Sequence, residues 1–455
     1  MRKKSVIVIL LFVFMALTLF GMFYNKPKEE KHDVKKENYN KLNAMVIKKE
    51  NGKVTLLDSD NIIYTFNLDD DFNLGDTVRV EYDGNLDKNK ELQDIQIKNY
   101  KVLDDYKDKN GIPKVWLDNG LFKKYYEKAY KKLEGMTLDE KIAQILLVRY
   151  PDDGIDVLKN NQFGGYVFYA KDFKDKTSDE VKKMMNDLQS VSKIPILTAV
   201  DEEGGRVVRV SSNPNLASSP FKSSRELYLE GGFDRIKEDT IQKSKLLYDL
   251  GINLNLAPVI DVSTDPNDYM YSRSLGEDSV ITSEYAKTVI SASHGLGVSY
   301  TLKHFPGYGN NVDTHEGVSV DERSYEDILN NDLPPFKAGI DEGAEAALVS
   351  HNIVSSVDAE NPASLSSSIH NLLRNELKFT GVIITDDLAM GATKDIDNST
   401  VKAILSGNDL IITTDYEDSM NSVREAINNG TLDESLIDKL AFRVIAFKYY
   451  KGLIV

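Results

Sequence analysis

From about residue 111 to its end, the chain alternates between short apolar runs and longer polar stretches. The runs are continuously apolar, which is typical of strands buried on both faces of a parallel sheet, and polar stretches such as 178–192 and 234–251 predict helices between them. The eight runs are 144–150, 164–170, 194–201, 252–262, 298–307, 346–354, 380–388 and 408–415. Eight strand–helix units predict an α/β protein with a closed (β/α)8 barrel over 111–455. An open, doubly wound sheet is the alternative, but no GxGxxG fingerprint follows a run and no P-loop motif occurs.

Residues 41–104 have a different pattern. Short runs in which apolar and polar residues alternate recur there, and turn signals such as ENGK lie between them. This pattern predicts a small all-β domain of five strands, barrel-like in form. The region contains no catalytic pattern, so we interpret it as a spacer or adaptor. A module that binds a partner or the cell wall is the alternative.

Residues 1–24 combine a basic start with an apolar segment. MRKKS is followed by the nineteen mostly apolar residues 6–24, which are long for a secretory signal and just long enough to cross a bilayer. Because a small-x-small cleavage site is lacking, we expect an uncleaved signal anchor with its basic end in the cytoplasm, then a charged linker over 25–40. A cleaved signal peptide is the alternative. Both interpretations place the rest of the protein outside a bacterial cytoplasm, either membrane-anchored or secreted.

Charge and cysteine content exclude several classes of function. The chain of 455 residues has a formal net charge of −16, which argues against nucleic acid as a partner because such proteins carry basic surfaces. Cysteine is absent, so disulfides, thiolate metal sites, a cysteine nucleophile and a lipid-modified cysteine are all excluded.

Polar residues gather where the predicted strands end. In a barrel, these ends lie together on the catalytic rim. One polar residue at the end of a strand needs no function, but a whole set on a single rim indicates an active site. The set comprises Asp201, Asp261, Lys303, His304, His351, Asp386, Asp387 and Asp415.

Two adjacent aspartates, Asp386 and Asp387, follow the apolar run GVIIT. A buried and rigidly held carboxylate can attack the anomeric carbon of a sugar. Neighbouring residues of a strand point to opposite faces, so one of the two could be the nucleophile while the other caps the following turn. The pattern modestly favours Asp386 as the nucleophile.

The stretch KHFPGYGNNVDTHEG (303–317) places several ionisable groups on a glycine-rich loop. Asp313 could orient His315 and raise its basicity, so the two would form an acid/base dyad, whereas the plain alternative is a surface loop with an isolated histidine. Zinc binding by His304, Asp313 and His315 matches no helical metal motif, so we predict no metal site. Lys303 and His304 would bind sugar hydroxyls or form salt bridges in the barrel mouth.

Two arginines extend the candidate site. Arg209 lies in VDEEGGRVVRV together with Asp201, and the glycines there would let the backbone approach a ligand. Arg273 lies in YSRSLG, on the loop after the fourth run. With Lys303, these cations suit a polyhydroxylated substrate, including one that carries an acidic group.

Six motifs of the chain resemble glycoside hydrolase family 3 and, more closely, its NagZ-type β-N-acetylhexosaminidase branch. The motifs are VDEEGGRVVR, NLAPVIDV, SRSLG, KHFPGYG, VDTHEG and GVIITDDLAMGA. They cover about 137–453 in the family's order, so the resemblance is specific. Related β-glucosidases lack the D-[ST]-H motif and carry their acid/base on a second, C-terminal domain. This chain ends shortly after its predicted barrel, which fits the hexosaminidase branch.

The resemblance implies a retaining glycosidase that acts through a covalent glycosyl-enzyme. It implies that Asp386 is the nucleophile and that His315, with Asp313 as its partner, is the acid/base. The implied substrate is terminal β-linked N-acetylglucosamine, especially in glycans derived from peptidoglycan. The implied sugar-binding residues are Asp201, Arg209, Arg273, Lys303 and His304. We therefore expect a carbohydrate as partner, no cofactor and a monomeric protein.

The chain departs from the family pattern within the loop. Where the family often has KHFPGHGDT, residues Tyr308, Asn310 and Asn311 replace a histidine, an aspartate and a threonine. If these residues hold the loop, the rate or the acceptor preference would change. Three functional alternatives stay open. The first is a phosphorylase, because a neutral histidine repels phosphate less than a carboxylate does. The second is another β-glycosidase of the family, and the third is a membrane-tethered glycan-binding protein without turnover.

Overall fold

The computed structural model describes residues 39–68, 72–86, 95–309, 311, 313–314 and 317–455. The predicted anchor, most of the predicted linker and His315 lie outside these residues. A helix that is long and apolar enough to cross a membrane is not found in this described part of the chain. Residues 40–455 form one compact unit.

Eight parallel strands form a nearly closed barrel, which confirms the predicted (β/α)8 fold. Each of the eight predicted runs contains one barrel strand, and neighbours in sequence are neighbours in the barrel. The last step, between β14 and β15, is made by a bridge from Ile384 to Leu410. The strands are β6 Leu146–Arg149, β7 Gly165–Phe168, β8 Leu197–Val200, β9 Leu254–Asn255, β10 Ser299–Phe305, β12 Ala346–Val349, β14 Val382–Thr385 and β15 Ile411–Thr413.

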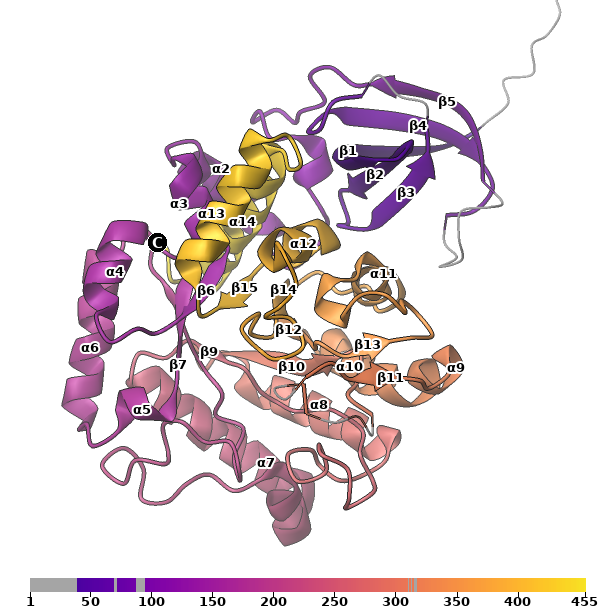
Figure 1. Ribbon diagram of the computed structural model, residues 1–455. Helices are drawn as coiled ribbons and strands as arrows, with labels where there is room; N and C mark the ends of the chain where they lie inside the picture. The colour runs from indigo at the N-terminus through magenta and orange to yellow at the C-terminus, as the bar shows by residue number, and fades with distance from the viewer. Residues whose placement is uncertain (1–38, 69–71, 87–94, 310, 312, 315–316) are drawn as a thin grey trace, which may run out of the picture. The chain divides into compact units, whose positions relative to one another are not determined.

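Helices surround these strands (Figure 1). The predicted helices at 178–192 and 234–251 correspond to α6 and to the later part of α7, which is interrupted at Gly231 and Gly232. The helices are α2 Tyr126–Leu133, α3 Leu138–Gln144, α4 Gly154–Asn161, α5 Ala170–Phe173, α6 Ser178–Val191, α7 Ser224–Asp249, α8 Ser279–Ser293, α9 Tyr325–Asp327, α10 Leu333–Asp341, α11 Ser367–Asn371, α12 Ser399–Ser406, α13 Tyr416–Asn428 and α14 Glu434–Tyr450. Two short strands, β11 Val320–Asp321 and β13 Ile353–Val354, pair beside the rim.

A separate antiparallel sheet precedes the barrel. Its strands are β1 Asn40–Glu50, β2 Lys53–Asp58, β3 Ile63–Asn67, β4 Thr77–Asp83 and β5 Gln96–Val102, in the order β3-β2-β1-β4-β5. The five strands were predicted from their alternation. Among the described residues, however, no pairing joins β3 to β5, so the sheet is open rather than barrel-like.

The sheet packs against the barrel through one face of its strands. Along β1, Ala44 and Val46 lie in the sheet's own core, whereas Met45 and Ile47 belong to the same hydrophobic cluster as the barrel core. This division follows from the two-residue period of a strand. The Asn371 side chain adds two hydrogen bonds to the backbone of Ile63, at 2.8 and 2.6 Å.

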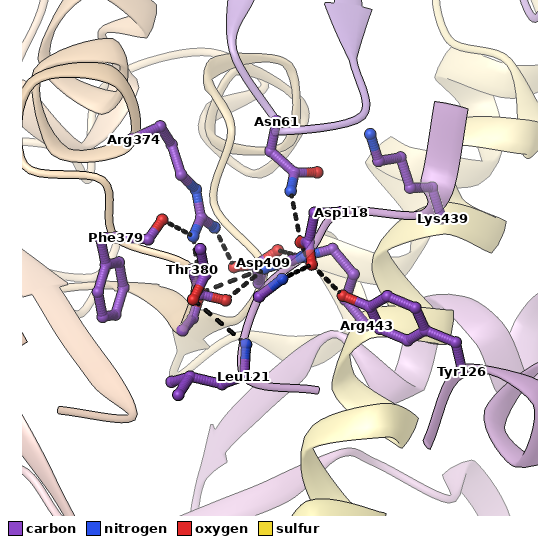
Figure 2. Close-up of polar contacts among 12 residues, drawn as sticks. Asn61, Asp118, Leu121, Tyr126, Arg374, Phe379, Thr380, Asp409, Lys439 and Arg443 are labelled. Atoms are coloured by element: carbon purple, nitrogen blue, oxygen red, sulfur yellow. Dashed lines mark hydrogen bonds and ion pairs between the residues drawn. The ribbon is translucent and has the colours of Figure 1, made fainter. Parts of the chain in front are cut away.

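A buried ionic network, which we call the base network, lies where β14 and β15 begin (Figure 2). Arg443 of α14 contacts Asp409 at 2.8 Å and Asp118 at 2.5 Å, and Arg374 contacts the other oxygen of Asp409 at 2.6 Å. Lys439, one turn earlier on α14, donates to the backbone carbonyl of Asp58 at 2.8 Å. The base network therefore ties α14 to the strand starts, and Lys439 ties the same helix to the small sheet.

Candidate active site

Lys303 is the centre of a buried ionic cluster at the C-terminal ends of the barrel strands. Its ammonium lies 2.7 Å from Asp201 Oδ1 and 2.7 Å from Glu203 Oε1. Arg273 reaches the same Glu203 carboxylate with Nη2 at 2.7 Å and Nε at 3.1 Å. Burial alone would raise the pKa of Glu203, but the two cations outweigh it and hold that pKa well below its usual range.

His304 is oriented by Asp261, at the rim beside Arg273. The ring Nδ1 donates to Asp261 Oδ2 at 2.8 Å, and the other carboxylate oxygen accepts the backbone N–H of Tyr308 at 2.7 Å. The ring Nε2 lies 3.4 Å from Arg273 Nη2, which can only donate. The His304 ring is therefore fixed in one tautomer by its two neighbours.

Asp386 follows β14, as predicted, and enters the same rim. Burial alone would raise its pKa, but His351, His304, the backbone N–H of Asp387 and Lys303 together lower it below the usual value. That N–H donates to Asp386 Oδ1 at 2.9 Å. In the described part of the chain, no ion pair within 4.0 Å links Asp386 to a cation. The surroundings thus keep Asp386 ionised, and because no described cation pairs with it, its carboxylate can still contact a ligand.

The neighbouring Asp387 uses both carboxylate oxygens in hydrogen bonds within the protein. Its Oδ1 accepts the N–H of Ala389 at 3.0 Å, and its Oδ2 accepts the hydroxyl of Thr414 at 3.1 Å. His351 is fully buried and donates from Nε2 to the Asp387 carbonyl at 3.0 Å, while Nδ1 contacts Ser364 at 2.7 Å. Asp387 and His351 therefore support the strand end that carries Asp386.

Arg209 faces the site less closely than Lys303 does. Its Nη2 lies 3.7 Å from Asp201 Oδ2, and its guanidinium carbon lies 5.2 Å from the centre of the Tyr169 ring. The loop that carries it is held by Glu202, whose buried carboxylate accepts the backbone N–H groups of residues 209–211 at 2.7–3.3 Å. Arg209 is consequently a rim cation on an anchored loop.

Asp313 lies close to Tyr269, on the glycine-rich loop after β10. Burial is the largest cause of the raised pKa of Tyr269. Arg273 opposes the shift, and Asp313, which is hydrogen-bonded to the Tyr269 hydroxyl, adds to it. His315, the predicted partner of Asp313, lies outside the described residues, so the dyad stays a prediction.

The structure brings together most of the predicted site and adds Glu203, which we did not predict. Three acids were present in VDEEGG, and the one that meets Lys303 and Arg273 comes just before the two glycines. Asp415, which was counted in the rim set, caps α13 by accepting the N–H of Asp418 at 2.9 Å. No group of three or more potential metal ligands occurs in the residues that the structure describes. The alternative zinc set included His315 and is not tested by this result.

A (β/α)8 barrel with an ionised carboxylate beside a buried cationic cluster at its C-terminal rim has the layout of a sugar-cleaving enzyme. Residues 137–447 match the family described as Glycosyl hydrolase family 3 N terminal domain. The chain therefore belongs to glycosyl hydrolase family 3 and is a glycoside hydrolase, which confirms the resemblance seen in its motifs.

Relatives with known names include two bacterial enzymes. A β-hexosaminidase of Xanthomonas campestris pv. campestris is 31% identical over 242 residues, which is 52% of this chain and 72% of that protein. A β-hexosaminidase of Xylella fastidiosa is 31% identical over 247 residues, which is 53% of this chain and 72% of that protein.

Similar solved structures include a family 3 β-N-acetylglucosaminidase from Paenibacillus sp. str. FPU-7 and LpqI of M. tuberculosis. The first has 27% identity and a TM-score of 0.65, and the match covers 70% of this chain but only 63% of that protein. The second has 27% identity and a TM-score of 0.64, and the match covers 70% of this chain and 95% of that protein.

Proposed function

We propose that the protein is a retaining exo-β-N-acetylglucosaminidase that removes terminal β-linked N-acetylglucosamine from peptidoglycan-derived glycans. The observation that carries the proposal is Asp386, an ionised carboxylate at the tip of a barrel strand beside Lys303 and His304. The relatives' names, β-hexosaminidase and β-N-acetylglucosaminidase, support the sugar class.

In the proposed first step, an Asp386 oxygen forms a bond to the anomeric carbon while the bond from that carbon to the leaving oxygen breaks. The electron pair goes to the leaving oxygen, which takes a proton from His315. In the second step, His315 removes a proton from water, the water oxygen bonds to the anomeric carbon, and Asp386 is released. Asp313 would orient His315 throughout.

The rim residues would bind the sugar through hydrogen-bond donors and acceptors that are not used up by contacts within the protein. Lys303 has three N–H groups, of which two meet Asp201 and Glu203, so one can donate to a sugar hydroxyl. Asp201 can accept a hydroxyl beside Arg209, and His304 and Arg273 complete the sugar-binding set. The closed ion pairs keep these groups fixed before the substrate arrives, which favours catalysis.

The location outside the cytoplasm also belongs to the proposal. It rests on the basic start and on the apolar segment 6–24. Protease added to intact cells that express the protein should digest it. After a high-salt wash, the protein should remain in the membrane fraction. Protection from the protease would contradict this location. The expected monomer can be checked by sedimentation of the protein from residue 39 onward.

The decisive experiment compares Asp386→Asn with Asp387→Asn on an aryl β-N-acetylglucosaminide. Asp386→Asn should lower kcat by about 10³-fold or more because an amide cannot replace the nucleophile. Asp387→Asn, the matched control, should keep most of the activity because that side chain supports a turn. Full activity in Asp386→Asn would refute the assignment.

Two further measurements distinguish the mechanistic alternatives. Proton NMR of the first-formed product should show the β-anomer, as retention requires, whereas the α-anomer would indicate inversion. Sugar 1-phosphate formed only when phosphate is added would identify a phosphorylase. Tight glycan binding with no turnover would identify a binding protein.

A further inference from the structure

Thr314 lies between Asp313 and His315 in the sequence and is completely buried. Its backbone N–H donates to the Tyr308 hydroxyl at 2.9 Å, and its own hydroxyl contacts the same oxygen at 2.8 Å. Its carbonyl accepts the N–H of Ala392 at 3.2 Å. Thr314 is thus anchored through its N–H, its side chain and its carbonyl.

Tyr308 is itself fixed against the active-site cluster. Its backbone N–H donates to Asp261, which also orients His304, and its side chain is buried. The ring lies 5.8 Å from that of Tyr269, to which Asp313 is hydrogen-bonded. The phenol therefore extends from the sugar-binding rim to the middle of the D-T-H motif.

The second anchor of Thr314 comes from the segment after β14, which also contains Asp386. Ala392 lies in the turn that follows β14, six residues after Asp386. One residue of the loop after β10 is thereby attached both to its own strand end and to the turn after β14. Such an attachment sets the separation between the two loops.

We propose that Tyr308 and Thr314 are positioning residues that fix the acid/base segment relative to Asp386. This inference rests on the proposed function, in which His315 donates the proton. A phenol oxygen can accept from the Thr314 N–H and donate to the Thr314 hydroxyl at one point. The family often has a histidine at position 308. In a neutral histidine the donor and the acceptor are two different ring atoms, whereas in Tyr308 a single oxygen serves as both, so only the tyrosine can bond the N–H and the hydroxyl of Thr314 through one atom.

Loss of the anchor should weaken acid catalysis selectively. Removing the Tyr308 hydroxyl leaves the buried N–H and hydroxyl of Thr314 without this partner, so the segment shifts. General acid catalysis is worth about 10²–10⁴-fold, and a displacement of about 1 Å can cost about 10²-fold. A leaving group that departs without protonation should be nearly indifferent to the shift.

The experiment measures kcat/KM, which reports the first chemical step, on phenyl and 2,4-dinitrophenyl β-N-acetylglucosaminides. Tyr308→Phe and Thr314→Val should lose about 10- to 100-fold on the phenyl substrate and less than about threefold on the dinitrophenyl substrate. Thr314→Ser, which restores the hydroxyl, should regain most of the activity on the phenyl substrate. Tyr166→Phe, which removes a buried hydroxyl bonded to the Gly154 carbonyl at 2.8 Å, should match the wild type on both substrates.

His315→Ala separates this inference from the proposed function. If His315→Ala loses activity equally on both substrates, His315 is not the acid and the proposed function fails. If His315→Ala depends on the leaving group while Tyr308→Phe and Thr314→Val match the wild type, the anchor is refuted. Equal losses by Tyr308→Phe on both substrates would show a merely structural role and also refute it. Should Tyr308→Phe fail to fold, the contrast between Thr314→Val and Thr314→Ser decides.

Discussion

The two ends of the barrel carry similar buried charges but arrange them differently. In the base network, Asp118 and Asp409 are paired directly with Arg374 and Arg443, so two anions meet two cations. At the rim, Asp201 and Glu203 are paired with Lys303 and Arg273, but Asp386 adds an anion that no described cation contacts within 4.0 Å.

The difference shows that burial and charge alone do not mark a functional site. The base network comes from segments far apart in the chain and is completed by its own members, which suits a structural role. The rim keeps donors and acceptors with remaining capacity and holds Asp386 ionised beside them. A charge that is stabilised without being paired can be used by a ligand.

The largest effect should come from breaking the base network. Asp409→Asn would remove the anion that Arg374 and Arg443 share, and it should lower the free energy of unfolding by about 3–5 kcal/mol. Urea denaturation would measure this. The matched change at the rim, Asp386→Asn, should leave the stability unchanged or higher, because functional carboxylates are often retained at a cost in stability. Equal destabilisation by the two changes would remove the distinction between the two ends.

The next effect concerns catalysis and compares two buried lysines. Lys303→Met would leave Asp201 and Glu203 close together without their shared cation and remove the proposed donor to the sugar. We expect kcat/KM to fall about 10²-fold, because losing hydrogen bonds to charged groups costs about 1.5–3 kcal/mol. Lys448→Met is the control, since Lys448 is equally buried but contacts Gln144 at 2.7 Å. A similar loss of activity in both variants would contradict a substrate-binding role for Lys303.

The smallest effect should appear in the pH dependence of stability. Burial lowers the pKa of Lys448 to about 7 from 10.5. Between these values the unfolded chain holds a proton that the folded chain has released, so stability rises with pH, by at most about 1.4 kcal/mol per unit.

Lys448→Met should reduce this rise, as measured by urea denaturation at pH 7, 8 and 9. Lys439, whose pKa burial also lowers to about 7, would supply the remainder. Lys182→Met, on the exposed side of α6, should leave the rise unchanged. An undiminished rise in Lys448→Met would show that this lysine stays charged in the folded protein.

Much of the fold and part of the site could be predicted because they depend on local patterns. Each barrel strand is a continuously apolar run, and Lys303 and Asp386 stand out because charged residues end such runs. Parallel strands bring those ends together without further information. The same logic overcounted Asp415, which is a helix cap.

Other features could not be predicted because they depend on contacts distant in sequence or on small backbone differences. Glu202 and Glu203 are neighbours of the same type, yet one binds backbone N–H groups and the other binds Lys303. Alternation alone does not decide whether a five-stranded sheet closes. In the base network, Asp118 and Arg443 lie hundreds of residues apart, and no local pattern pairs them.

The base network also has a consequence for the protein during its synthesis. Arg443 lies on α14, which follows all eight barrel strands, and it neutralises Asp118, which precedes the first of them. A growing chain therefore carries Asp118 without its cation, and Asp409 paired with Arg374 alone, until α14 has been made. We therefore expect barrel closure, and with it the ordering of the segment that carries Asp386, to follow the synthesis of α14. Shortened products of translation should consequently be inactive even when they contain every residue of the rim.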